Sequence, residues 1–353
     1  SIIVPGYNEE VNIVRTITTL KQQDYPNLHI YFVDDGSKDH TLERVHEAFD
    51  NDDTVTVLAK KNGGKASALN YGIAACRSEY VVCIDADTQL KNDAVSRLMK
   101  HFIADTEKRV GAVAGNVKVG NQRNMLTYWQ AIEYTSSQNF DRMAYSNINA
   151  VTVVPGAIGA FRKEVIEAVG GFTTDTLAED CDLTMSINEH GYIIENENYA
   201  VAMTEAPETL RQFVKQRIRW CFGVMQAFWK HRSSLFAPSK KGFGLWAMPN
   251  MLIFQYIIPT FSPLADVMML IGLFTGNALQ VFLYYLIFLI IDASVSIMAY
   301  IFEGERLWVL LWVIPQRFFY RWIMYYVLFK SYLKAIKGEL QTWGVLKRTG
   351  HVQ

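Results

Sequence analysis

A surplus of one charge and a repeated unit are both missing from this sequence. The 34 Lys and Arg residues nearly balance the 35 Asp and Glu residues, so the net charge is close to zero. Proteins whose bulk partner is nucleic acid usually carry a clear excess of positive charge, so we expect no such partner here. Neither internal repeats nor low-complexity segments stand out along the chain.

Cysteine is scarce, and its spacing excludes further chemistry. Cys76, Cys83, Cys181 and Cys221 form no C-x-x-C pair and stand apart from histidine, so we expect no zinc site. We expect reduced, mostly buried thiols in a cytosolic compartment. An initiator methionine and a signal peptide are also missing. Residues 1–5 already read as a strand, so we expect the sequence to begin inside a domain, with any upstream membrane helix outside it.

The first part of the chain alternates short, β-branched apolar runs with helical patterns. We predict strands at residues 2–4, 29–33, 54–58, 80–84 and 110–114. Between them we predict helices at residues 11–23, 41–49, 65–76 and 94–103. This order predicts an α/β fold with a mostly parallel sheet that is covered on both faces. Ligands of such sheets bind beyond the carboxyl ends of the strands.

Polar clusters follow three of these strands directly, at residues 6–10, 34–39 and 85–88. They should therefore converge at one edge of the sheet. Asp85 and Asp87 can bring one carboxylate to a metal and the other to a ribose. Mg²⁺ and Mn²⁺ typically take one or two carboxylates and complete their shell with substrate phosphates. A solvated turn is the alternative explanation for two such carboxylates.

Three further features suit a sugar nucleotide, although each has an ordinary structural alternative. Asp35 ends a strand and can accept a hydrogen bond from a base N–H group. Lys65 follows two glycines and precedes a helix, a position that suits a phosphate. The segment is not a Walker A loop, because Ala59 stands where that motif needs glycine. Glu179 or Asp180 can act as a general base toward a hydroxyl group, or can stabilise a helix N-terminus instead.

Residues 208–229 show the clearest helical pattern. An apolar stripe is formed by Leu210, Phe213, Val214, Ile218, Cys221, Phe222, Met225 and Phe228. At about 100° per residue, Gln216, Arg219 and Trp220 share one face, which we predict to lie opposite this stripe. We interpret Trp220 as a stacking platform for a sugar ring and Arg219 as a ligand of a diphosphate. Packing of Trp220 beneath a membrane region is the alternative.

Three apolar stretches follow, at residues 248–274, 279–302 and 307–333. The second is long enough to span a bilayer, which takes about 20 residues. Prolines interrupt the first, and a proline with two arginines interrupts the third, so each can span with a kink or lie at the interface. A basic cluster near the end favours a cytoplasmic C-terminus and consists of Lys330, Lys334, Lys337, Lys347 and Arg348. Three full crossings would place this cluster outside, so we expect one stretch not to cross fully.

Taken together, these motifs resemble the membrane-bound processive glycosyltransferases of family 2, the group of cellulose, chitin, hyaluronan and poly-N-acetylglucosamine synthases. The matching segments occur in the family's order and are residues 4–10, 34–37, 64–66, 85–87, 179–180 and 216–220. Residues 115–116, 160–162 and 205–210 look most like poly-N-acetylglucosamine and chitin-type synthases. One departure is visible, because the family's Thr-Glu-Asp triplet begins with Ala178 here. The base is kept, but its local support is in doubt.

The resemblance implies a GT-A type, Rossmann-like domain on the cytosolic face of the inner membrane, followed by an amphipathic interface helix and several transmembrane helices. It implies that Asp35 reads uracil, within a nucleotide-sugar site of Pro5, Tyr7, Glu9, Asp35, Lys65 and Asp85. The implied ligands of a Mg²⁺ or Mn²⁺ ion are Asp87 and Asp85. Asp180, with Glu179 beside it, is the implied catalytic base. Gln216, Arg219 and Trp220 are the residues implied to hold diphosphate and acceptor sugar.

The activity implied is the inverting, metal-dependent transfer of a hexosamine, with N-acetylglucosamine favoured, from UDP to a growing β-linked polysaccharide. The implied partners are the UDP-sugar, the polymer, the lipid bilayer and accessory export proteins. A UDP-glucose-using cellulose-like synthase, a non-processive transferase to a lipid phosphate and an inactive membrane scaffold are the alternatives. We expect a transferase domain at residues 1–205, acceptor and interface helices at 206–245, a membrane region at 246–335 and a cytosolic tail at 336–353.

Overall fold

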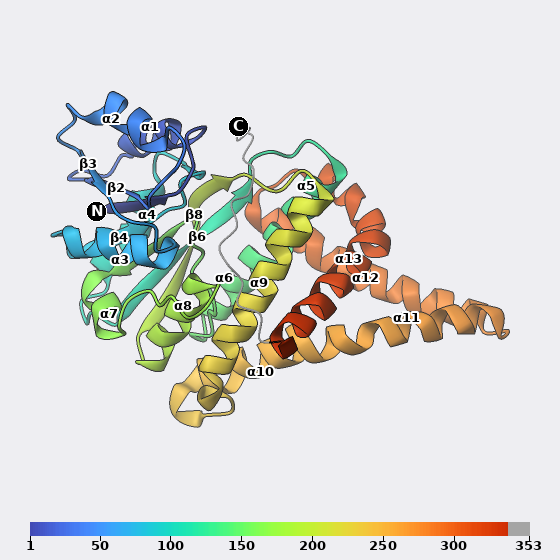
Figure 1. The fold of residues 1–353 in the computed structure, drawn as a ribbon. Coiled ribbons are helices and arrows are strands. Elements are labelled where there is room, and N and C mark those ends of the chain that lie inside the picture. Colours follow the sequence, from blue (N-terminus) through green and yellow to red (C-terminus); the bar gives the residue numbers. More distant parts are fainter. Residues whose placement is uncertain (338–353) are drawn as a thin grey trace.

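An eight-stranded sheet forms the centre of the computed structural model, which describes residues 1–337 (Figure 1). The strands are β1 (Ile2–Gly6), β2 (Ile30–Asp34), β3 (Val55–Ala59), β4 (Tyr80–Cys83), β5 (Gln89–Leu90), β6 (Val110–Val119), β7 (Gly159–Arg162) and β8 (Ile193–Thr204). Their order across the sheet is β3-β2-β1-β4-β7-β6-β8-β5. Strands β1 to β4 run parallel, β7 runs antiparallel between β4 and β6, and β8 pairs in parallel with β6.

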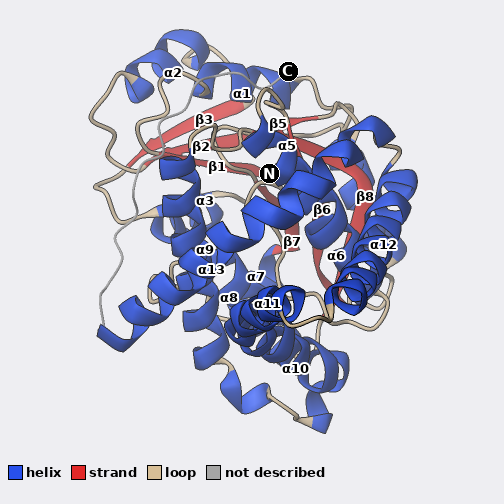
Figure 2. Cartoon of the chain, turned by 90° about the vertical axis from the view of Figure 1, so that its right-hand side faces the viewer, coloured by secondary structure: helices blue, strands red, loops and turns tan. Residues whose placement is uncertain are grey.

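Helices cover both faces of this sheet, as the alternating sequence pattern predicts. Those around it are α1 (Ile13–Lys21), α2 (Thr41–Phe49), α3 (Lys65–Ala75), α4 (Ala94–Ala104), α7 (Lys163–Ala168) and α8 (Glu179–Glu189). Along β1, Ile2 and Val4 enter one apolar cluster and Ile3 enters the other, because successive strand residues point to opposite faces. Figure 2 shows α1 and α2 on one side of β1 to β3 and α3 on the other.

The sheet is more mixed than its first 115 residues indicate. All five predicted strands and all four predicted helices of that part form, with shifts of a few residues at their ends. Strands β7, β8 and the short β5 were not predicted. The middle of β8 reads Glu195-Asn196-Glu197-Asn198, which hides the apolar alternation by which a strand is recognised. The pairing of β6 with β8 is also irregular between Ala114 and Asn116.

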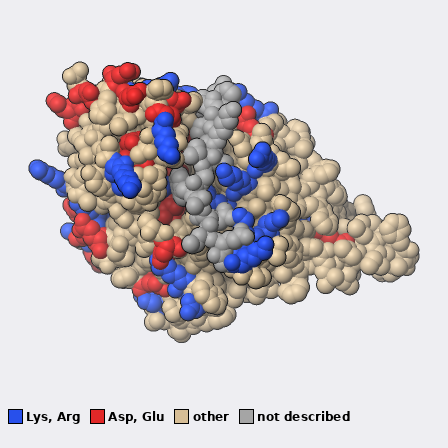
Figure 3. All heavy atoms as spheres, viewed as in Figure 1, with Lys and Arg blue, Asp and Glu red and all other residues tan. Residues whose placement is uncertain are grey.

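A second group of helices packs beside the sheet. It consists of α5 (Met125–Glu133), a π-helical segment (Tyr134–Asn139), α6 (Phe140–Ser146), α9 (Leu210–Lys230), α10 (Met248–Asn250), α11 (Ile258–Phe274), α12 (Ala278–Glu303) and α13 (Val313–Lys337). Figure 1 shows α11 and α12 projecting away from the body of the protein. Figure 3 shows that this projection carries little charge.

Two helices of the described chain are long and apolar enough to cross a membrane. They are Phe243–Phe274, in which short π-helical segments precede α11, and Ala278–Glu303. The first apolar stretch is therefore one continuous helix despite its prolines. The third stretch begins with a 3₁₀ turn at Leu307–Trp312, continues as α13 and does not join these two candidates. Lys347, Arg348 and residues 338–353 of the expected tail lie outside the described residues.

Helix α13 packs along α9 and is joined to both apolar helices by charged side chains. Arg321 pairs with Asp266 of α11, and Arg317 pairs with Asp292 of α12. Tyr325 also donates a hydrogen bond to Asp266 at 3.1 Å. The arginines that interrupt the third apolar stretch thus have carboxylate partners on the other two.

Candidate active site

A cavity of about 1200 Å³ opens beyond the carboxyl ends of β1, β2 and β4 and continues between α8, α9, α11 and α13. Every site residue named from the sequence lines it: Pro5, Tyr7, Glu9, Asp35, Lys65, Asp85, Asp87, Glu179, Asp180, Gln216, Arg219 and Trp220. We call the part of the cavity that the strand-end residues line its strand end, and the part that α9 lines its helix end. The topology therefore brings these segments together, although their individual roles stay predictions.

At the strand end, the carboxylate of Asp35 is held by its own neighbouring loop. It accepts backbone hydrogen bonds from Gly63 at 3.0 Å and from Gly64 at 2.7 Å. The ammonium of Lys60 pairs with it at 2.7 Å. Gly64 has a φ of +86°, which glycine adopts readily. The loop at residues 60–64 thus folds over the side chain that we expect to meet the base.

Lys65 is a counter-ion for carboxylates in this structure. Its Nζ lies 2.6 Å from Oδ1 of Asp85 and 3.1 Å from Oε1 of Glu179. Burial alone would lower the pKa of Lys65, but Asp85, Glu179 and Asp180 raise it above its ordinary value. A Cβ atom at Gly156 would lie 2.5 Å from this Nζ, so a glycine leaves room for the ammonium. Lys65, which we expected to bind a phosphate, therefore neutralises the carboxylates of Asp85 and Glu179 in this structure.

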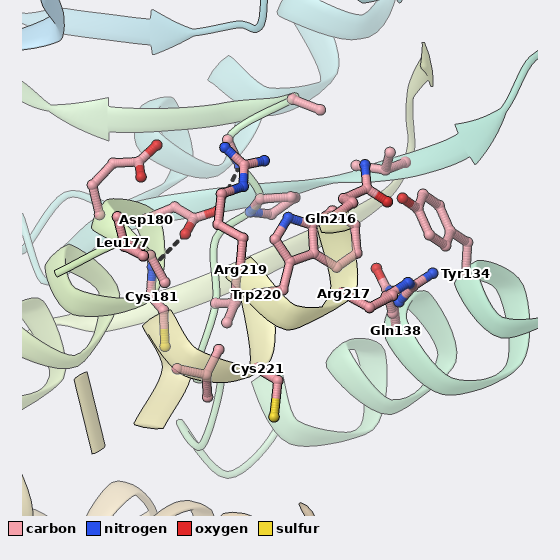
Figure 4. Close-up of a pocket in the computed structure, with 18 of the residues that line it drawn as sticks. Tyr134, Gln138, Leu177, Asp180, Cys181, Gln216, Arg217, Arg219, Trp220 and Cys221 are labelled. Atoms are coloured by element: carbon pink, nitrogen blue, oxygen red, sulfur yellow. Dashed lines mark hydrogen bonds between the residues drawn. The ribbon is translucent and has the colours of Figure 1, made fainter. Parts of the chain in front are cut away.

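Asp180 lies in the first turn of α8, where its side chain points into the cavity (Figure 4). Its two oxygens accept backbone hydrogen bonds from Gly156 at 3.2 Å and from Cys181 at 2.8 Å. Burial and the neighbouring Glu179 raise the pKa of Asp180 to about 6, while Lys65 opposes the shift. These hydrogen bonds come from the backbone, so the missing hydroxyl at Ala178 does not remove them.

The predicted separation of polar and apolar faces on α9 is wrong. Trp220 is half-buried and packs against the main apolar cluster, and its ring centre lies 6.4 Å from the ring centre of Tyr134. Phe213, which we assigned to the opposite stripe, is fully buried only one turn before Gln216. The helix is covered by α8 on one side and α13 on another, so both faces pack. Trp220 therefore contacts the protein's own core as well as the cavity.

Arg217 is a cavity residue that the sequence interpretation missed. Its guanidinium lies 4.6 Å from the ring centre of Trp220 and pairs with Glu133 at 2.6 Å. Tyr320 of α13 donates a hydrogen bond to the same carboxylate. Arg217 stands inside the motif at residues 216–220, which was the available signal. Its partners come from α5 and α13, and nothing in the sequence connects those segments.

A divalent cation would find two carboxylates after β4. Within residues 1–337, no group of three or more His, Cys, Asp or Glu side chains is arranged to hold a metal. Asp87 is buried and Asp85 is partly exposed, both beside the cavity. Two carboxylates fit a Mg²⁺ or Mn²⁺ ion that takes its other ligands from a diphosphate. Asp85 and Asp87 therefore fit such an ion. In this structure Asp85 is paired with Lys65.

Comparison with solved structures defines the class of fold. The structure is similar to a mannosyltransferase from Pyrobaculum calidifontis, solved in complex with GDP-Man and Mn²⁺. The TM-score is 0.62 at 22% sequence identity, and the alignment covers 96% of this chain and 87% of that one. The mixed sheet and its flanking helices therefore have the GT-A fold.

Sequence comparison then shows which proteins the chain is similar to. Residues 1–170 match the family model described as glycosyl transferase family 2. Poly-beta-1,6-N-acetyl-D-glucosamine synthase of Staphylococcus epidermidis is 33% identical over 233 residues, which cover 65% of this chain and 56% of that protein. The synthase of Staphylococcus aureus strain COL is 33% identical over 223 residues, covering 63% and 54%. The chain spans about half the length of the curated relatives it matches.

Proposed function

We propose that the chain transfers N-acetylglucosamine, with inversion, from UDP to the end of a growing β-linked polysaccharide at a membrane. One observation carries this proposal. A single cavity joins strand-end carboxylates, a buried carboxylate of raised pKa and an aromatic surface on α9. These are the parts needed to hold a sugar nucleotide, remove a proton and bind a sugar acceptor. The names of the relatives support N-acetylglucosamine as the sugar.

The strand end of the cavity is the proposed donor site. Asp35 accepts a hydrogen bond from the N–H group of uracil, after the loop at residues 60–64 has moved aside. Pro5, Tyr7 and Glu9 surround the nucleotide. Asp87 and Asp85 hold a Mg²⁺ or Mn²⁺ ion, which supplies positive charge to the leaving diphosphate when bound. Lys65 is within reach of the same region and adds a second positive charge.

Asp180 is the proposed general base, and Glu179 supports it by raising its pKa. Its ionised carboxylate takes the proton of the acceptor hydroxyl, whose oxygen then bonds to the anomeric carbon. The bond from that carbon to the UDP oxygen breaks on the opposite side of the ring, which inverts the configuration. A base with a pKa near the operating pH combines sufficient basicity with a large ionised fraction. Asp180 meets that condition.

The helix end of the cavity is the proposed acceptor site. Trp220 offers one side of its indole to a sugar ring, while Gln216 and Arg219 bind polar groups of the sugar and the diphosphate. The cavity continues past Gln255, Ser262 and Tyr325, between α11 and α13. We propose that the apolar helices place this end at the membrane, with the transferase domain on the cytosolic side.

The deciding experiment is an assay of product formation by membranes that contain the full-length protein. UDP-N-acetylglucosamine, UDP-glucose and GDP-mannose are supplied separately with Mg²⁺ or Mn²⁺, and products are identified by mass spectrometry. We expect a β-linked N-acetylglucosamine polymer from the first donor only, and none from membranes with the Asp180→Asn variant. A polymer from UDP-glucose, or a lipid that carries one sugar, would replace the proposed activity by one of the alternatives.

A further inference from the structure

One face of α9 serves two neighbours. Gln216 lies on this face in the first half of the helix and lines the cavity. Two turns further along the same face, a Cβ atom at Gly223 would lie only 2.7 Å from the backbone nitrogen of Ala178. One turn beyond, Oε1 of Gln226 accepts a hydrogen bond from the N–H group of Leu177 at 3.1 Å. Helix α9, which carries the proposed acceptor residues, therefore also packs against the backbone just before α8.

The C-terminal end of α9 contacts α8 through a histidine. His231 directly follows the helix, and its Nε2 lies 3.0 Å from Oδ1 of Asp182. Its Nδ1 lies 2.8 Å from Oε2 of Glu189. The side chains of His231 and Asp182 are almost completely buried. Asp182 and Glu189 stand seven residues apart on α8, which is about two helical turns. One imidazole ring therefore holds α8 at two points along its length.

Both contacts require the charged form of the ring. An ionised carboxylate only accepts hydrogen bonds, so the imidazole must donate from both nitrogens. Burial alone would lower the pKa of His231, but Asp182 and Glu189 raise it to about 9. Lys230 also pairs with Asp182 at 2.9 Å, and Nζ of Lys240 donates to the backbone oxygen of Glu189. Thr173 donates to Asp182, Ser234 donates to Glu189, and Asp175 shares Lys230 with Asp182.

We infer that His231 is a positioning residue that locks α8 onto α9, so that Asp180 keeps a fixed place relative to Gln216, Arg219 and Trp220. The inference rests on the proposed function, because it assigns the base to α8 and the acceptor site to α9. His231 itself does not reach the cavity lining. Asp180 stands in the first turn of α8 and accepts one of its two backbone hydrogen bonds from Cys181 of the same helix, so its place depends on where α8 lies. A misplacement of about 1 Å can cost about a hundredfold in rate.

The test replaces His231, which we call the clamp on α8, in the full-length protein. It measures both the rate of sugar transfer and the mobility of α8. In His231→Gln we expect kcat per folded molecule to fall about ten- to a hundredfold. KM for UDP-N-acetylglucosamine should stay within about twofold, because the strand-end residues are untouched. Amide hydrogen exchange in α8 should become faster, while exchange in α3 stays unchanged. Glu189→Gln should produce a smaller effect of the same kind, and adding it to His231→Gln should lower kcat no further.

His101→Gln is the matched control. His101 of α4 pairs with Glu197 of β8 at 3.1 Å, so it is also a histidine–carboxylate contact, although a more exposed one, and it does not touch α8. We expect its kcat and its α8 exchange to equal those of the unmodified protein. Unchanged α8 exchange in His231→Gln, or a loss of activity that only follows the loss of folded protein, would overturn the inference. If the unmodified protein turns over no sugar nucleotide, the proposed function fails, and α8 exchange still decides whether the clamp exists.

Discussion

The two ends of the cavity are built differently. At the strand end, opposite charges already satisfy one another, as Lys65 does with Asp85 and Lys60 with Asp35. At the helix end, rings surround buried polar atoms. Oε1 of Gln216 and the Nε and Nη2 atoms of Arg217 have no hydrogen-bond partner among residues 1–337. Ion pairs dominate the first end, whereas aromatic rings with unused hydrogen-bonding atoms behind them dominate the second.

This difference indicates how each substrate enters. A donor diphosphate and its cation must replace contacts that already exist, for example by drawing Lys65 away from Asp85. An acceptor sugar instead meets aromatic rings, behind which lie buried groups whose hydrogen-bonding capacity is not used by the described protein. Leaving such groups unsatisfied costs about 1–3 kcal/mol each. We therefore expect donor binding to break ion pairs that already exist, and acceptor binding to leave those ion pairs in place.

The largest expected effect concerns the residue that lies between the two ends. Asp180→Asn keeps the size of the side chain but cannot take a proton, so we expect turnover to fall about 10²–10⁴-fold. Affinity for UDP, measured by calorimetry, should remain near its original value. Asp50→Asn, an exposed change on the α2 side of the molecule, is the control and should alter neither quantity. A parallel collapse of UDP affinity would place Asp180 in the donor network.

Loss of the metal site should affect only the donor end. Asp87→Asn removes a buried carboxylate, and we expect a loss of several kcal/mol of transition-state stabilisation, equivalent to at least about a hundredfold in rate. A chelator should inhibit the unmodified protein equally strongly, and added Mn²⁺ or Mg²⁺ should reverse that inhibition. Binding of short oligosaccharide acceptors should not change. Full turnover in excess chelator would exclude this role of Asp87.

The pH dependence of kcat/KM tests whether the ion pairs at the strand end control the pKa of Asp180. We expect kcat/KM to rise with pH through about 6, because only ionised Asp180 accepts a proton. Below that value the rate should fall about tenfold per pH unit. Lys65→Met removes the cation that lowers the pKa of Asp180, so the acid limb should move to higher pH. An acid limb that stays in place would separate Lys65 from the base.

The raised pKa of Asp180 also determines the direction in which protein stability changes with pH. The pKa of Asp180 is higher in the folded protein, at about 6, than the ordinary value of 3.8. The folded state therefore binds more protons between these values, and the contribution of this group to stability falls as pH rises through that window. Thermal unfolding of the unmodified protein and of Asp180→Asn, compared between pH 4 and pH 6, measures this contribution.

The smallest expected effect on turnover concerns the acceptor end. Trp220→Ala removes both a half-buried core contact and the proposed sugar platform, so we expect shorter polymer and a moderate fall in melting temperature. Trp129→Ala is the matched control, because Trp129 is fully packed and does not line the cavity. Burial of that kind is worth about 3–5 kcal/mol, so it should destabilise more but leave polymer length unchanged in the folded fraction. Normal polymer length in Trp220→Ala would remove the sugar platform from the proposal.

The sequence allows prediction where local pattern is sufficient. Strands β1 to β4 and β6 have clear apolar runs, and the carboxyl ends of parallel strands meet at one edge, so the gathering of Asp35, Asp85 and Asp87 could be predicted. The packing of Trp220 could not, because a helical wheel contains no information about neighbours. Tyr320 of α13 lies a hundred residues beyond Trp220, yet its contact with Phe213 helps to cover that helix.

The same reason explains why the clamp on α8 escaped prediction. His231 and Glu189 are ordinary surface-type residues in the sequence, and neither belongs to a motif. Only the close approach of α8 and α9 brings them together, and Gly223 leaves room on α9 for the backbone just before α8. Residues that hold other residues in place carry no spacing signal of their own.

The ion pairs of α13 also set an order for making the protein. Asp266 on α11 and its partner Arg321 are separated by 55 residues, and Asp292 on α12 and Arg317 by 25. Both apolar helices therefore leave the ribosome before the cations that neutralise them exist. A bare carboxylate among lipid chains is costly. In the membrane placement that we propose, α11 and α12 therefore settle deeply only after α13 has been synthesised, so that α13 completes their insertion.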